Sequence, residues 1–229
     1  MNILAFDTCF SACSVALQQN SSLIAERLKL LERGHAEEIF PMISEVLSDA
    51  KIDWEEIDCL GITNGPGTFT GLRVGLAAAR GIALTRKIPI SAFSSLHAIA
   101  AGTFRIDELK DVESFLVVSD ARRNEVYIQS FNNEAQPLVE PALIQISDVI
   151  SWASSKNIGI IGSGVDPLFN KIPEVSSRLR LLKGEYYPQA RDIAALTEEA
   201  MSRSTWSYEG PPSPIYLRAP HVKMLKKSK

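Results

Sequence analysis

One segment of the chain combines residue types that could bind an anion: the glycine-rich turn and helix start at Gly65–Gly75, which reads GPGTFTGLRVG. Gly65 and Gly67 permit a positive φ or a close backbone approach, and Pro66 fixes one dihedral between them. A strand–turn–helix junction of this kind directs free N–H groups outward, where they could hold a phosphate. Gly65, Gly67 and Thr68 are therefore candidate nucleotide-binding residues.

The spacing of this turn departs from both common nucleotide-binding patterns. A phosphate-binding loop needs G-x-x-x-x-G-K-[ST], and no lysine stands at the required place. A dinucleotide-binding turn needs G-x-G-x-x-G, but Thr70 occupies the third glycine position. Thr70 is instead a plausible N-cap for the helix that follows. The glycines alone are a weak signal for a nucleotide.

The helix after the turn carries a stripe of small residues. Gly71, Gly75 and Ala79 are four residues apart and so line one face. A glycine inside a helix costs about 1 kcal/mol relative to alanine, and close approach of another backbone would compensate for that cost. Two interpretations stay open: part of the same chain lies against the stripe, or a second protein docks there. The candidate partner interface comprises Gly71, Arg73, Gly75, Ala78, Ala79 and Ile82, with Arg80 beside it.

Other potential nucleophiles and metal ligands are scattered: His35, His97, His221, Ser163, Cys9, Cys13 and Cys59. Ser163 lies in Gly-Ser-Gly and not in the G-x-S-x-G pattern of a nucleophile elbow. The cysteines have no evident basic activator and form no C-x-x-C pair, which fits a reduced, cytoplasmic setting. We predict no catalytic residue and no metal ligand in this chain.

Composition limits the partners that the chain can have. A net charge of −3 over 229 residues argues against strong nucleic-acid binding by this chain alone. The tail is locally basic, with Lys223, Lys226, Lys227 and Lys229. It is either a solvated end or a weak contact with RNA held mainly by a partner. The start MNILAF does not resemble a signal peptide, and the apolar stretch Val74–Leu84 is too short to span a membrane.

Strands and helices alternate in both halves, which predicts a two-lobed α/β protein. We expect a first lobe over residues 1–102 and a second over 103–229, with a helix at 189–203 packing back on the first. Strands are expected at 2–7, 12–17, 22–30, 57–63, 89–93, 114–119, 125–131 and 158–161. Helices are expected at 35–50, with Pro41 as a kink or start, at 71–85, from 94 or 95, and at 146–153, 164–171 and 189–203.

Four segments follow one another in the order and spacing of a known family: ILAFDTCFSACSVAL, GHAEEIFPMI, ITNGPGTFTGLRVGLAAARGIAL and the near-terminal PIYLRAP. On these motifs the chain resembles the TsaB (YeaZ) family, densely over residues 1–100 and thinly from about 105 to 210. The resemblance implies the fold shared by actin, sugar kinases and heat-shock ATPases (ASKHA). It also implies a non-catalytic subunit that serves TsaD, the transferase that builds threonylcarbamoyladenosine at tRNA position 37.

The same resemblance implies the partners and the ligand. They are a TsaD-like catalytic subunit, a TsaE-like ATPase, a second copy of the chain when it is alone, and tRNA indirectly through the complex. In the wider superfamily an acidic residue after the first strand lies by the nucleotide phosphates, which makes Asp7 and Thr8 candidates. Phe10 and Ser11, however, replace the glycine and the basic residue of active members, so the alternative is that Asp7 caps the turn and is a relic of the fold. We therefore expect no cofactor in the isolated chain, with ATP or ADP at the heteromeric interface.

TsaD-like enzymes carry a helical His-x-x-x-His pair that binds a metal, and the corresponding positions here resemble Phe93 and His97. Phenylalanine cannot ligate, so His97 is expected to be a core or capping residue. Two other functions stay open: a glycoprotease-like peptidase and a stand-alone ASKHA-type small-molecule kinase. The subunit hypothesis predicts no turnover by the chain alone, and loss of partner binding when Gly75 is enlarged or charged.

Overall fold

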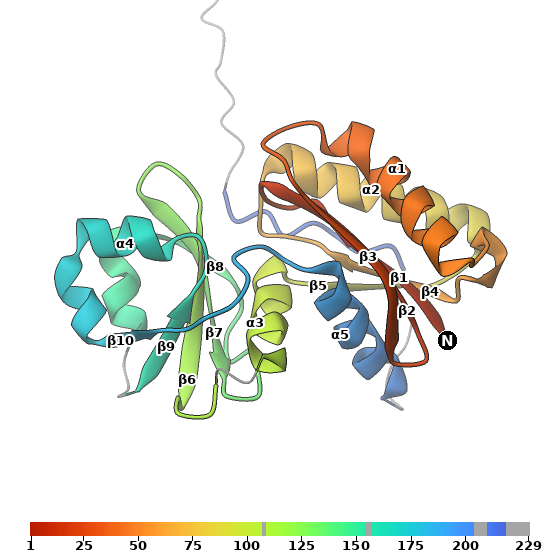
Figure 1. Cartoon of the computed structure of the whole chain (residues 1–229). Coiled ribbons are helices and arrows are strands. Elements are labelled where there is room, and N and C mark those ends of the chain that lie inside the picture. The colour runs from red at the N-terminus through yellow and green to blue at the C-terminus, as the bar shows by residue number, and fades with distance from the viewer. Residues whose placement is uncertain (107–108, 154–156, 204–209, 219–229) are drawn as a thin grey trace, which may run out of the picture.

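Two five-stranded mixed sheets organise the computed structural model of the chain, which describes residues 1–106, 109–153, 157–203 and 210–218 (Figure 1). The first sheet has the strand order β3-β2-β1-β4-β5 and the second has the order β10-β9-β6-β7-β8. In each, three strands form an antiparallel meander, a fourth strand pairs in parallel with the first of the three, and a fifth pairs in parallel with the fourth. The two sheets therefore share one topology, which gives the predicted two-lobed α/β architecture.

The first sheet contains the strands that were predicted most accurately. It consists of β1 (Asn2–Asp7), β2 (Ala12–Gln19), β3 (Ser22–Leu30), β4 (Cys59–Thr63) and β5 (Ile90–Phe93). The two central strands β1 and β4 are buried along nearly their whole length, since helices cover both faces of the sheet. Both are accordingly continuous apolar runs.

The second sheet includes two strands that the sequence pattern did not predict. It consists of β6 (Ser114–Asp120), β7 (Glu125–Asn132), β8 (Ala142–Gln145), β9 (Ile158–Ile161) and β10 (Leu179–Leu181). Strands β8 and β10 are the two edges of this sheet and have only four and three residues. Short, partly exposed edge strands lack a clear alternation of apolar and polar residues, which explains why they were missed.

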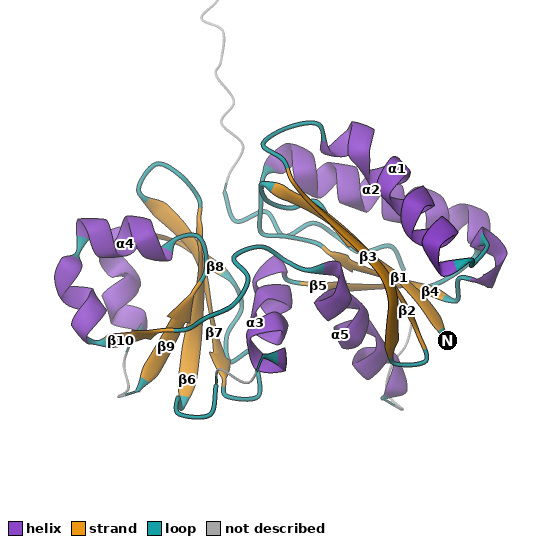
Figure 2. Cartoon of the chain, in the orientation of Figure 1, coloured by secondary structure: helices purple, strands orange, loops and turns teal. Residues whose placement is uncertain are grey.

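Helices cover both faces of the first sheet (Figure 2). Helices α1 (His35–Ala50) and α2 (Phe69–Arg86) lie on one face, and α5 (Ala190–Ser202) lies on the other, against β1, β2 and β4. Pro41 lies inside α1, which begins at His35. Helix α4 (Val165–Lys171) and the 3₁₀ helices η2 (Ile146–Trp152) and η3 (Pro173–Ser177) belong to the second lobe, and η1 (Trp54–Glu56) precedes β4. None of the helices described here is both long and apolar enough to cross a membrane.

Helix α3 (Ser95–Arg105) joins the two sheets, since it follows β5 and packs against β6 and β7. The division expected at residues 102 and 103 falls inside this helix. Gly102 faces α5, where an added methyl group would lie 2.7 Å from Oδ2 of Asp192. The small residue at this point thus permits the close packing of α3 on α5.

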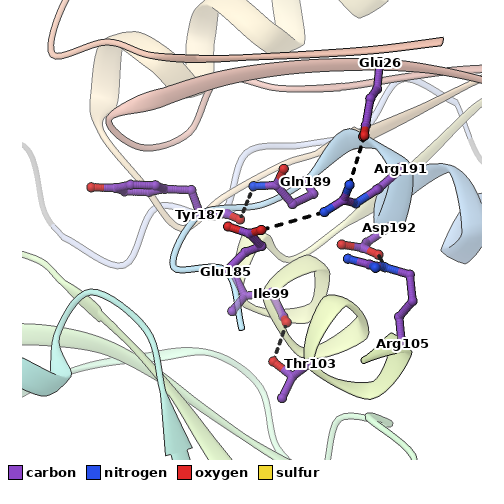
Figure 3. Close-up of polar contacts among 9 residues, drawn as sticks. All are labelled: Glu26, Ile99, Thr103, Arg105, Glu185, Tyr187, Gln189, Arg191 and Asp192. Carbon is purple, nitrogen blue, oxygen red and sulfur yellow. Dashed lines mark hydrogen bonds and ion pairs between the residues drawn. The ribbon is translucent and has the colours of Figure 1, made fainter. Parts of the chain in front are cut away.

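Ion pairs fix the start of α5 to both lobes (Figure 3). Arg191 contacts Glu26 of β3 at 2.9 Å and Glu185 of the preceding loop at 3.8 Å. Asp192, which is almost fully buried, accepts a hydrogen bond of 2.6 Å from Nε of Arg105 on α3. The side of the molecule that carries α3 and α5 is therefore firmly connected.

Candidate functional site

A cavity of about 910 Å³ lies where the glycine-rich turn meets the second lobe. Its walls come from the β1–β2 turn, the loop before α1, the start of α2, the β6–β7 turn and the segment after residue 214. Gly67 and Thr68 of the glycine-rich turn are part of its lining, as is Phe10. Phe10 also contacts Tyr127 of the second sheet, with ring centroids 6.4 Å apart. The cavity is thus a junction between the lobes.

The cavity is lined by several arginines. Arg33, Arg122 and Arg123 have no ion pair among the described residues, whereas Arg218 is paired with Glu125. Acidic side chains also line the cavity: Glu32, Glu37 and Asp120. Free guanidinium groups and the hydroxyl groups of the lining threonines are donors that suit phosphate oxygens. The cavity can accordingly accept an anion.

The glycine-rich turn packs on the β1–β2 turn, which explains its small residues. The N–H of Thr68 donates to the carbonyl of Cys9 over 2.7 Å, and a methyl group at Gly67 would overlap that carbonyl. Gly65 has a φ of 104°. Thr68, and not Thr70, caps α2, because its Oγ1 accepts the N–H of Gly71 at 3.2 Å. Helix α2 therefore begins at Phe69, two residues before the predicted start.

Asp7 lies behind this turn, outside the cavity lining. Its Oδ1 accepts hydrogen bonds from the Thr63 hydroxyl and, at 3.2 Å, from the Cys9 N–H, and its Oδ2 has no hydrogen-bond partner among the described residues. Burial raises the pKa of Asp7 to about 6, although the bonds from Thr63 and Cys9 oppose that rise. Thr8 is equally buried, and its hydroxyl donates to the carbonyl of Gly71 over 2.7 Å. Of the five predicted nucleotide-binding residues, only Gly67 and Thr68 reach the cavity.

The predicted partner stripe on α2 faces the interior of the chain. A methyl group at Gly71 would overlap the carbonyl of Thr8, and one at Gly75 would lie 2.6 Å from Thr8 Oγ1. Ala78, Ala79 and Ile82 are also buried. Of the two interpretations of this stripe, contact within the same chain therefore applies to Gly71 and Gly75, because the β1–β2 turn lies against them. Enlarging Gly75 would disturb the fold itself, so it does not isolate a partner contact.

The opposite face of α2 is open and also carries small residues. Thr70, Ala77, Gly81 and Leu84 are exposed on it, and an added methyl group at Gly81 would meet none of the described residues within 4 Å. Leu84 is 81% exposed, an unusually large fraction for a leucine. Ala77 lies seven residues after Thr70, Gly81 four after Ala77, and Leu84 three after Gly81, so all four lie on one stripe of the helix. That spacing was readable in the sequence, but the choice between the two faces required the structure.

Arg73 is the one member of the predicted interface that is exposed. Its guanidinium lies 3.7 Å from the centroid of the Phe69 ring, and its Nε donates to the Tyr216 hydroxyl over 2.9 Å. This side chain thus connects α2 with the C-terminal segment. The lysine-rich tail beyond it, like His221, lies outside the described residues.

His97, Ser163 and His35 have structural contacts. His97 packs between the rings of Phe93 and Phe131, with centroids 6.0 and 5.7 Å away, and burial lowers its pKa. The Ser163 hydroxyl accepts the N–H of Asp120 over 3.1 Å. Nε2 of His35 lies 2.8 Å from the carbonyl of Phe10. In the described chain, no three His, Cys, Asp or Glu side chains gather as a metal site.

All three cysteines are buried free thiols. Burial raises the pKa of the Cys13 and Cys59 thiols to about 12 and also raises that of Cys9. A buried thiol with a raised pKa remains protonated at neutral pH and is a poor nucleophile. These residues therefore act as core side chains.

Comparison with known proteins identifies relatives of the chain. Residues 29–205 match the family model described as "TsaD: tRNA N6-adenosine threonylcarbamoyltransferase". A protein of Haemophilus influenzae named tRNA threonylcarbamoyladenosine biosynthesis protein TsaB is 37% identical over 58% of this chain and 55% of its own length. A protein of the same name from Buchnera aphidicola subsp. Schizaphis graminum is 31% identical over 83% of this chain and 90% of its own length. The chain thus spans only about half the length of the first of these relatives.

Solved structures give the same grouping. A Pseudomonas aeruginosa protein, described as uncharacterized with similarity to peptidase YEAZ, superposes with a TM-score of 0.80 at 26% identity, over 95% of this chain and 99% of its own. A ROK hexokinase from Thermus thermophilus superposes with a TM-score of 0.51 at 10% identity, over 85% of this chain and 98% of its own. The second likeness concerns the fold alone, and it confirms the predicted actin-like and sugar-kinase-like architecture.

Proposed function

The chain belongs to the TsaB (YeaZ) family of tRNA threonylcarbamoyladenosine biosynthesis proteins, and from this premise we propose that it is a non-catalytic subunit that binds and activates a TsaD-like transferase. The observation that carries the proposal is the likeness to a TsaB protein over nine-tenths of that relative's length. The setting of Asp7 supports it: this carboxyl group is held by Thr63 and Cys9 behind the glycine-rich turn, away from any substrate in the cavity.

We place the partner on the exposed face of α2, along Ala77, Gly81 and Leu84. Small side chains let a second helix approach closely, and the exposed leucine supplies apolar surface to bury. The chain matches the TsaD family model over residues 29–205, a range that includes α2, so a TsaD-like partner has an equivalent helix to offer. Two related helices can pair about an approximate twofold axis, and a second copy of this chain can take the same place when TsaD is absent.

We further propose that ATP or ADP binds once the partner is in place, at the cavity and not at Asp7. Arg122 and Arg123 on the β6–β7 turn and Thr68 at the start of α2 can donate to phosphate oxygens. Asp7 does not fit that role, because its carboxyl group is buried and its pKa is raised. A TsaE-like ATPase and tRNA would join through the assembled complex, in the cytoplasm.

The test mixes the purified full-length chain with its cognate TsaD-like protein and follows the mass of the complex and its affinity for ADP and ATP. Ala77→Glu places a charge on the proposed interface, whereas Ala195→Glu places the same charge on the exposed side of α5. We expect a complex for the unchanged chain, a dissociation constant raised about 30-fold or more by Ala77→Glu, and little effect of Ala195→Glu.

Two outcomes would contradict the proposal. Equal binding by both variants would move the partner to another surface. No complex with or without nucleotide, together with hydrolysis of a peptide or turnover of ATP by the isolated chain, would favour the peptidase or the kinase. The peptidase is kept as an alternative because the Pseudomonas aeruginosa structure is described as similar to peptidase YEAZ.

A further inference from the structure

The segment Gly210–Arg218, here called the C-terminal strap, crosses from one lobe to the other without forming a helix or strand. In Figure 1 it passes along the first lobe and ends between the two lobes, at the start of the grey trace. It belongs to neither sheet, yet side chains and carbonyls of both lobes hold it. None of these contacts is needed to complete a helix or a strand.

On the first lobe the strap runs antiparallel to α2. Arg80 donates to the carbonyl of Pro212 over 2.6 Å, and seven residues earlier in α2 Arg73 donates to the Tyr216 hydroxyl over 2.9 Å. Four extended residues reach about 13 Å and seven helical residues rise about 10 Å, so the strap follows the helix closely between these points. The Tyr216 ring also lies 5.7 Å from that of Phe69.

The strap is fastened to the glycine-rich turn as well. The N–H of Ile215 donates to the carbonyl of Asn64 over 2.8 Å, and the Asn64 amide donates to the carbonyl of Ser213 over 3.0 Å. A methyl group at Gly65 would lie 3.0 Å from the carbonyl of Ile215. Leu217 then packs against the main hydrophobic core. Backbone, polar and apolar contacts together hold the strap on the first lobe.

On the second lobe the described part of the strap is attached through the side chain of Arg218. The guanidinium of Arg218 donates to the carbonyl of Ala121 over 2.9 Å and to the carboxylate of Glu125. Both acceptors flank the β6–β7 turn, where Arg122, Arg123 and Asn124 have positive φ angles near 60°. This turn and the strap line the same cavity.

From these contacts we propose that the C-terminal strap is a clamp that holds the β6–β7 turn toward the first lobe and so sets the opening of the cavity, with Arg218 as its latch. The lobes are joined on the other side by α3 and by the ion pair of Arg105 with Asp192 (Figure 3). On this proposal that side is the hinge, and the strap spans the opposite side, where the rings of Phe10 and Tyr127 also meet. The clamp acts within one chain and does not depend on the proposed partner.

The test uses the chain with Arg218→Gln, which keeps a polar side chain but shortens it and removes the charge. Hydrogen exchange of the amides of residues 120–125 should become about tenfold faster, because charge-assisted hydrogen bonds hold that turn. Spin labels on Ser48→Cys and Ser177→Cys, one on each lobe, should show a longer and broader distance distribution. The native cysteines are buried and do not compete for the label.

Three further variants sharpen the result. Arg218→Lys should restore part of the protection, and Glu125→Gln should loosen the turn from the other side of the same latch, which covers the case that Arg218→Gln does not fold. Arg178→Gln removes an exposed arginine with no ion pair among the described residues and should change neither measurement. Wild-type exchange in Arg218→Gln and Glu125→Gln would overturn the clamp. So would faster exchange with an unchanged label distance, since the latch would then act only locally.

Discussion

The buried carboxyl group of Asp7 makes a prediction that separates a structural residue from a ligand-binding one. Asp7 is about 1% exposed, its pKa is raised from 3.8 to about 6 by burial, and its Oδ2 has no hydrogen-bond partner in the part of the chain that the structure describes. The folded chain therefore binds a proton at Asp7 between about pH 4 and pH 6, where the unfolded chain has already lost it. The contribution of Asp7 to the free energy of unfolding is therefore complete below about pH 4 and is lost as the pH rises through about 6.

The size of the effect follows from the shift in pKa. A rise from 3.8 to about 6, at 1.36 kcal/mol for each pH unit, corresponds to about 3 kcal/mol of unfolding free energy. Asp7→Asn removes the titration and keeps the shape. The stability of the wild type minus that of Asp7→Asn should therefore fall by about 3 kcal/mol from pH 3.5 to pH 7, which cancels the titrations that both proteins share.

The assay is denaturant unfolding of both proteins at several pH values, with two-state behaviour checked by a second probe. Thr63→Val supplies a second arm. The Thr63 hydroxyl lowers the pKa of Asp7, so its removal should move the midpoint of the difference curve to higher pH. A flat or rising difference would refute the reasoning. Asp7 would then be ionised at little cost in the folded chain and available to a cation or phosphate-bound metal.

Two pairs of substitutions test the account of α2. Gly71→Ala should destabilise the chain by about 2 kcal/mol or more, since the new methyl group overlaps the carbonyl of Thr8. Gly81→Ala should stabilise the chain by about 0.5–1 kcal/mol, because alanine favours the helix and its methyl group meets no described residue. Thermal unfolding measures both changes, and equal effects would contradict the packing of α2. Thr68→Ala should cost about 1 kcal/mol as the loss of a helix cap, and Thr70→Ala should cost little; the reverse order in the same assay would restore Thr70 as the cap.

Much of the first lobe could be predicted from local pattern. Strand β1 and helix α1 have the predicted limits because their apolar residues repeat at the period of the element and their ends carry turn residues. Strands β8 and β10 depend on pairing with strands elsewhere in the chain. Each is too short to show a periodic pattern of apolar residues in the sequence. The sequence also showed no sign that the two sheets share one topology. The two sheets repeat the order in which their strands pair, but not the residues of those strands.

The candidate site was predicted less well because each residue had a plausible role that depended on its neighbours. Asp7 lies at the end of β1, as the resemblance implied, yet whether a carboxyl group faces a cavity or a neighbouring turn depends on residues more than fifty positions away, such as Thr63. The arginines on the β6–β7 turn and Arg218 were not singled out at all. They lie far apart in the sequence and meet only when the strap crosses between the lobes.

For helix α2 the structure decides which small residues contact the same chain and which face is exposed. The periodicity placed Gly71 and Gly75 on one face and required a close neighbour to offset their cost, and Thr8 is that neighbour. No such neighbour exists for Gly81 among the described residues, although it carries the same conformational cost and lies beside the exposed Leu84. Close approach of the proposed partner would account for a glycine there. This asymmetry between two small-residue faces of one helix is what supports a partner on the exposed face.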